Sequence, residues 1–63
     1  MGTVIMQNGF RVMQHDDNND VMIYKDGHLM RKRHASRKLK EDEMIRLFWF
    51  EYEVVGGLED EKH

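Results

Sequence analysis

Short apolar runs alternate with turn residues over the first half of the chain, a pattern typical of β-hairpins. The segments Thr3–Gln7 and Phe10–His15 flank Asn8-Gly9, and both of these turn residues tolerate the positive φ of a two-residue type I′ turn. We therefore predict a hairpin whose register follows from its turn. The expected cross-strand pairs are Gln7 with Phe10, Ile5 with Val12, and Val4 with Met13.

A second hairpin is expected after the polar turn cluster Asp16–Asp20. Val21–Lys25 and a segment from His28 to about Arg33 flank Asp26-Gly27, another type I′ signal. The expected pairs are Tyr24 with Leu29 and Ile23 with Met30. Neither hairpin has a clean alternation of apolar and polar residues, so we expect both faces of the sheet to be at least partly covered.

The last element is predicted as a helix from about Glu41 to Val55. Acidic residues occupy its first turn, Leu39 and Met44 have the spacing of a hydrophobic staple, and Gly56-Gly57 supplies a stop. A strand is the competing interpretation of Leu47–Val55, because its aromatic residues and valines favour strands. The expected apolar stripe is wider than one sheet can cover, and it consists of Met44, Ile45, Phe48, Trp49, Tyr52 and Val55, extended by Leu47 and Val54.

These elements predict the α+β class. We expect residues 1–63 to form one small domain, in which two consecutive hairpins make a four-stranded antiparallel meander and one C-terminal helix packs on the sheet. The acidic tail, residues 58–63, is expected to be frayed. An order of four strands and one helix is too generic to imply a function by analogy.

A chain of 63 residues buries a small core, and small domains usually need disulfides, a metal or a partner chain for stability. This chain has no cysteine, which excludes disulfides and thiolate zinc sites and leaves packing or oligomerisation. The absence of cysteine fits a reducing compartment, and no apolar run approaches transmembrane length. We therefore expect a cytoplasmic protein that does not associate with membranes.

The charge distribution is uneven. Six of the ten Lys and Arg residues lie in the basic segment, residues 31–40, whereas the rest of the chain has four basic residues against twelve acidic ones. The segment could bind phosphates of a nucleic acid, contact an acidic protein surface, or be a solvated edge strand protected from aggregation. It lacks aromatic residues that would stack on bases. The residues expected to contact an acidic partner or phosphates are Arg31, Arg33, Arg37 and Lys38.

Catalytic and metal-binding patterns are weak. The run Asp16–Asp20 resembles half of a calcium loop, but Val21 replaces the turn glycine and Gly27 replaces the bidentate glutamate. The four histidines show no i,i+4 pair, and the only hydroxyl nucleophiles of the serine and threonine type are Ser36 and Thr3. We expect no enzymatic activity, no metal and no cofactor.

The leading functional prediction is a non-catalytic interaction or regulatory protein, homodimeric, that binds another macromolecule. Each predicted strand contains one methionine, which fits either core filling or an adaptable docking surface. The alternatives are a small nucleic-acid-binding protein that uses the basic segment and, with less support, an inhibitor of a host enzyme encoded by a mobile element. The residues expected to mediate self-association are Leu47, Trp49, Phe50 and Val54.

Overall fold

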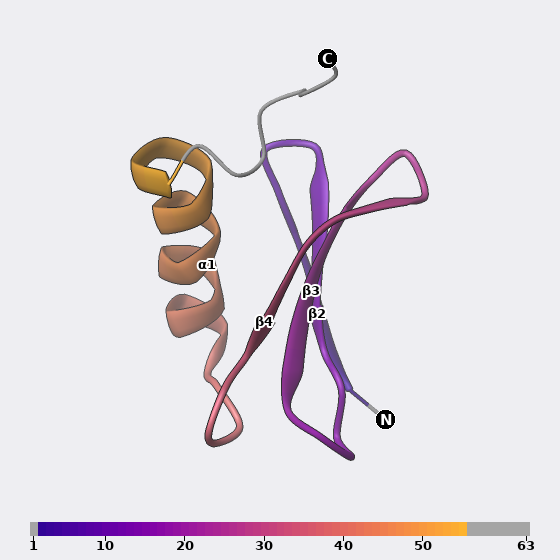
Figure 1. Ribbon diagram of the computed structural model, residues 1–63, viewed down its shortest axis with the longest axis vertical. Coiled ribbons are helices and arrows are strands. Elements are labelled where there is room, and N and C mark those ends of the chain that lie inside the picture. Colours follow the sequence, from indigo (N-terminus) through magenta and orange to yellow (C-terminus); the bar gives the residue numbers. More distant parts are fainter. Residues whose placement is uncertain (1, 56–63) are drawn as a thin grey trace.

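A computed structural model describes residues 2–55 and confirms the predicted α+β class. The four strands form one antiparallel sheet in the order β1-β2-β3-β4, and the helical segment lies against one face of it (Figure 1). The predicted stop at 56–57 and the predicted frayed tail at 58–63 lie outside the described residues. The elements are β1 (Thr3–Gln7), β2 (Phe10–Gln14), β3 (Asp20–Lys25), β4 (His28–His34), α1 (Glu41–Trp49) and η1 (Phe50–Val55).

The first hairpin has the predicted register. Asn8 and Gly9 have φ angles of 53° and 80°, as a type I′ turn requires, and this turn sets Gln7 opposite Phe10. The pairs Ile5 with Val12 and Val4 with Met13 are also confirmed. The turn chemistry alone was therefore sufficient to fix which residues of β1 and β2 share a face.

The second hairpin contains a β-bulge that the sequence pattern did not predict. Asp26 and Gly27 form the expected turn, with φ angles of 52° and 82°, and Tyr24 pairs with Leu29 as predicted. The next pair was predicted incorrectly, because Ile23 lies opposite Arg31 rather than Met30. The inserted residue reverses the alternation along the rest of β4. Arg31 and Arg33 consequently point to the helix side of the sheet, because their cross-strand partners do.

Gln14 links the loop between β4 and α1 to the sheet through side-chain hydrogen bonds. Its side chain is fully buried. Its Nε2 donates hydrogen bonds to the backbone carbonyls of Asn19 and Arg37, both at 3.0 Å, and its Oε1 accepts one from the N–H of Leu39 at 2.8 Å. One amide therefore satisfies three backbone groups from two loops, as burial of polar groups requires.

The helix begins where the sequence predicts. The N–H of Lys40 donates to the Glu43 carboxylate at 2.8 Å, which is half of a capping box, since a lysine ammonium cannot accept the reciprocal bond. Arg46 and Asp42 form an i,i+4 ion pair at 3.1 Å. The ending differs from a plain α-helix, because residues 50–55 have π-helical hydrogen bonding. This wider turn occurs where the polar residue Glu51 enters the core, and π turns are often found at such special positions.

Acid should destabilise the protein partly through Glu43. The hydrogen bonds from Arg37 and from the Lys40 backbone lower the pKa of Glu43 to about 2, from an ordinary value of 4.5. A carboxyl whose pKa is lower in the folded state stabilises that state above its unfolded pKa, and this contribution disappears as the pH falls to its folded pKa. We expect Glu43→Gln to lose less stability than wild type between pH 4.5 and 2.

Urea midpoints measured at several pH values would check this expectation. Glu41→Gln is the matched control, because it removes a first-turn acid that has no ion-pair partner among residues 2–55. Equal slopes for wild type and Glu43→Gln would contradict the prediction.

The core lies between the helix and one face of the sheet. Phe10 contacts Phe48 with ring centroids 5.2 Å apart and Tyr52 with centroids 5.8 Å apart, joining the first hairpin to the helix. The expectation that both faces of the sheet are covered is wrong for residues 2–55, since all described helical turns lie on one side (Figure 1). The buried apolar residues are Ile5, Phe10, Val12, Val21, Ile23, Met44 and Phe48.

Candidate interaction surface

The face of the sheet opposite the helix, called the open face below, is unusually apolar for a surface in contact with water. Val4, Met6 and Leu29 are 52%, 66% and 51% exposed, respectively. An antiparallel sheet with one solvated face normally carries polar side chains on that face. Contiguous exposed apolar residues typically mark an interaction site. The open face consists of Val4, Met6, Arg11, Met13, Asp20, Met22, Tyr24, Leu29, Lys32 and His34, assigned from their cross-strand pairs.

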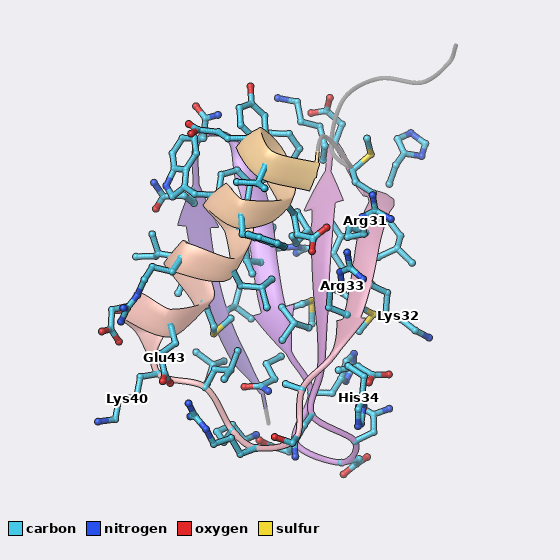
Figure 2. The ribbon with its side chains drawn as sticks, turned by 60° about the vertical axis from the view of Figure 1, so that its left-hand side comes forward. Arg31, Lys32, Arg33, His34, Lys40 and Glu43 are labelled. Carbon is cyan, nitrogen blue, oxygen red and sulfur yellow. The ribbon has the colours of Figure 1, made fainter. Side chains whose placement is uncertain are left out.

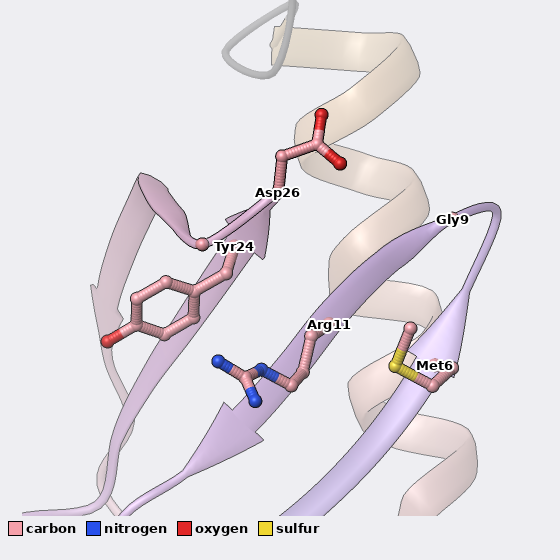
Figure 3. Close-up of a pocket in the computed structure, with 6 residues that line it drawn as sticks. Met6, Gly9, Arg11, Tyr24 and Asp26 are labelled. Atoms are coloured by element: carbon pink, nitrogen blue, oxygen red, sulfur yellow. The ribbon is translucent and has the colours of Figure 1, made fainter.

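A pocket of about 380 Å³ lies on the open face near the tips of both hairpins. Figure 3 views it with the helix behind the sheet and shows Arg11 between Met6 and Tyr24. The Arg11 guanidinium lies 5.4 Å from the centre of the Tyr24 ring, a cation–π contact. No carboxylate among residues 2–55 lies within ion-pair distance of Arg11. The pocket therefore combines the apolar side chain of Met6, the Tyr24 ring, the Arg11 guanidinium and the acidic side chain of Asp26, and Arg11 and Asp26 form no ion pair in the described structure.

Two arginines of the basic segment neutralise a buried carboxylate. Glu51 is 1% exposed, and its Oε2 accepts a hydrogen bond from Arg33 Nε at 2.5 Å. Arg31 Nε lies 3.0 Å from Glu51 Oε1, as an ion pair rather than an aligned hydrogen bond. The bulge in β4 explains this arrangement, because without it Met30 and Lys32 would face the helix instead.

Four other basic side chains of the segment also have carboxylate partners, whereas the Lys40 side chain has none within ion-pair distance among residues 2–55. Figure 2 shows where Arg31–His34 and Lys40 lie. Arg37 donates to both carboxylate oxygens of Glu43, at 3.0 and 2.7 Å. Lys38 contacts Asp16, and its hydrogen bond lowers the pKa of that carboxyl to about 2. All four cations predicted to contact an acidic partner or phosphates thus have intrachain ion pairs, and the charge they present to a ligand is reduced accordingly. On the open-face side of β4, Lys32 and His34 share Asp20 at 4.0 and 3.0 Å.

The four residues predicted to mediate self-association divide into two groups. Leu47 and Trp49 are half-buried and pack against the core, and the Trp49 ring contacts Phe48 at a centroid distance of 5.0 Å. Phe50 and Val54 are 52% and 70% exposed, and they lie four residues apart on the outer side of the helix. The structure therefore leaves Phe50 and Val54 available to a partner and brings Trp49 into the aromatic core cluster.

Arg11 and Tyr24 were not identified as candidate site residues from the sequence. A usable signal existed, because the predicted register places Arg11 opposite Met6 on the same face as Val4. An isolated charged residue among apolar cross-strand neighbours indicates either an ion pair or a binding position. The neighbouring Tyr24 could not be added, because pairing between the two hairpins depends on a loop whose geometry the sequence does not specify.

Comparison of the chain with protein families, with curated proteins and with solved structures gave no significant match. Within residues 2–55, no helix is both long and apolar enough to cross a membrane.

Proposed function

We propose that this chain is a non-catalytic, homodimeric interaction protein that binds another protein through the open face of its sheet. The observation that carries the proposal is the group of exposed apolar side chains on a face that no described element covers. Leaving three large apolar side chains half-exposed forgoes about 25 cal/mol per Å² of burial, and a partner recovers that free energy. Their methionine-rich surroundings suit a surface that adapts to its ligand.

The chemistry of the open face favours an acidic, amphipathic protein segment as its occupant. Within residues 2–55 Arg11 has no carboxylate partner, and the Lys32 side chain is 59% exposed on the same face, although it also lies 4.0 Å from Asp20. An apolar segment flanked by Asp or Glu would bury Val4, Met6 and Leu29 and place a carboxylate at Arg11. A single-stranded nucleic acid is less well matched, because Tyr24 is the one aromatic ring on this face.

Two further properties belong to the proposal. A cytoplasmic location is supported by the absence of cysteine. Self-association is supported by the exposed apolar surface that residues 2–55 retain after folding, since small domains often complete their cores in an oligomer.

The test is affinity capture from the native cell with Arg11→Glu and Arg46→Glu compared with wild type. Both variants change the net charge equally, but Arg46 lies on the exposed helix surface, outside the open face. A captured protein should then be purified and titrated. We expect Arg11→Glu to weaken its binding by about tenfold or more, the equivalent of about 1.4 kcal/mol for a charge-assisted contact, and Arg46→Glu to have little effect.

Three outcomes would contradict the proposal. The first is equal binding by both variants, which would place the contact elsewhere. The second is capture of nucleic acid whose binding weakens steeply with salt, which would favour the nucleic-acid alternative. The third is no retained ligand of either kind.

A further inference from the structure

The two edges of the sheet differ in their protection against pairing with another strand. The β4 edge contains a bulge and the consecutive cationic or basic residues Arg31–His34, both of which discourage edge-to-edge pairing. The β1 edge, Thr3–Gln7, has no charged residue and no proline, and it pairs with β2 through five uninterrupted positions. Within residues 2–55 no further strand pairs with the β1 edge, which therefore remains competent to accept another strand.

The turn geometry shows which backbone groups β1 offers. A two-residue β-turn closes with a hydrogen bond between its flanking residues, so Gln7 and Phe10 form a hydrogen-bonded pair. Hydrogen-bonded and non-hydrogen-bonded pairs alternate in an antiparallel ladder. The backbone N–H and carbonyl of Ile5 therefore bond to β2, whereas those of Val4 and Met6 point outward. Two N–H groups and two carbonyls of β1 thus lack a ladder partner in this sheet.

We infer that β1 pairs antiparallel with β1 of a second copy of this chain, across a two-fold axis at Ile5. This inference rests on the homodimer in the proposed function and gives it a geometry. Val4 then lies opposite Met6 of the second copy, and the two symmetric pairs exchange four N–H···O hydrogen bonds. In this register every outward-pointing backbone N–H and carbonyl of Val4 and Met6 forms a hydrogen bond.

Charge and symmetry favour a second copy over other strands. Self-pairing of β1 brings no charged residues together, whereas self-pairing of β4 would set its cations against one another. Pairing of β1 with β4 of another copy would be head-to-tail and would not close. A two-fold β1 contact closes, and it leaves the protected β4 strands at both ends of an eight-stranded sheet.

The contact also extends the open face. A two-fold axis perpendicular to the sheet keeps the two helices on one side and the two open faces on the other. Val4 and Met6, the most exposed apolar pair of β1, then lie at the centre of a continuous surface rather than at its margin. A partner bound there would contact both copies.

The test compares Met6→Pro with Met6→Ala. Proline removes an outward N–H but no hydrogen bond of the intrachain ladder, whereas alanine keeps the N–H and removes the same side chain. Sedimentation from about 1 µM to about 1 mM should give a dimer for wild type and Met6→Ala, and a dissociation constant raised by about tenfold or more for Met6→Pro. A folded Met6→Pro variant that dimerises as strongly as Met6→Ala would overturn the inference.

Amide hydrogen exchange of the wild-type protein supplies a second readout that does not depend on the folding of a variant. The N–H groups of Val4 and Met6 should become protected as the protein concentration rises. A wild-type protein that stays monomeric, with both amides exchanging freely, would overturn the inference. If that monomer still binds its partner through Arg11, the proposed binding function stands and only the β1 dimer fails. If instead a β1 dimer forms but no partner binds, the dimer stands and the proposed binding function fails. Protection that appears only when the protein partner is added would mean that the partner, rather than a second copy, occupies the edge.

Discussion

Gln14→Leu should destabilise the protein by about 2–4 kcal/mol, because three backbone hydrogen bonds worth about 1 kcal/mol each are lost and their partners remain unsatisfied. The stability of a domain of this size is only about 3–9 kcal/mol at the usual contribution per residue. The carbonyls of Asn19 and Arg37 and the N–H of Leu39 all depend on this one amide. Leucine fills a similar volume, so the effect isolates the hydrogen bonds from packing.

Gln14→Glu makes the reason testable. A carboxylate can still accept from Leu39, but it cannot donate to Asn19 and Arg37, and its charge would face their carbonyl oxygens. We therefore expect Gln14→Glu to be the less stable variant at neutral pH and to recover partly when acid protonates the new carboxyl. Denaturant midpoints would check both variants. Free energies of unfolding within about 0.5 kcal/mol of wild type for both variants would show that the Gln14 hydrogen bonds are dispensable.

The structural role of Gln14 could not be predicted from the sequence, because its hydrogen-bond partners lie far from it along the chain. The fold followed from local signals, namely two type I′ turns and a capped helix, and these depend only on neighbouring residues. Gln14 continues the buried alternation of Phe10 and Val12, and a polar residue on an apolar face is a recognisable anomaly. Its partners, however, lie 5 to 25 residues away in loops, and no periodicity encodes those distances.

Glu51 shows the same limit on the helix. It follows Phe48 by three residues and is buried like it, in a position where a carboxylate needs a cation. The basic segment was an obvious source of that cation, but the predicted pairing of Ile23 with Met30 placed Arg31 and Arg33 on the face opposite Ile23. The bulge, which has no local sequence signature here, reverses the alternation and delivers Arg31 and Arg33. Because the bulge was not predicted, Arg31 and Arg33 were interpreted as free charges, whereas they form internal ion pairs with Glu51.

Removing Arg31 and Arg33 should lower the free energy of unfolding more than removing both arginines together with Glu51. Arg31→Leu combined with Arg33→Leu leaves Glu51 buried without a cation, and breaking a buried pair in this way typically costs about 3–5 kcal/mol. Adding Glu51→Leu removes the stranded charge, so the triple variant should recover to within about 1 kcal/mol of wild type or exceed it. Urea denaturation of the three proteins measures both steps. A double variant as stable as wild type, or a triple variant without recovery, would show that the cluster does not act as a buried ion pair.

The ion pairs of Arg31 and Arg33 with Glu51 determine which variants can test nucleic-acid binding. A loss of binding in the Arg31 and Arg33 double variant could follow from unfolding, because these arginines stabilise the position of the helix on β4. Arg37→Leu with Lys38→Leu is the matched pair, since both side chains make exposed ion pairs that contribute little to stability. If phosphates bind the basic segment, this second variant should stay folded and reduce the slope of log affinity against log salt, because two phosphate contacts are lost. An unchanged slope in the folded variant would exclude these two side chains as phosphate contacts and leave the open face, with Arg11 in its pocket, as the better-supported binding surface.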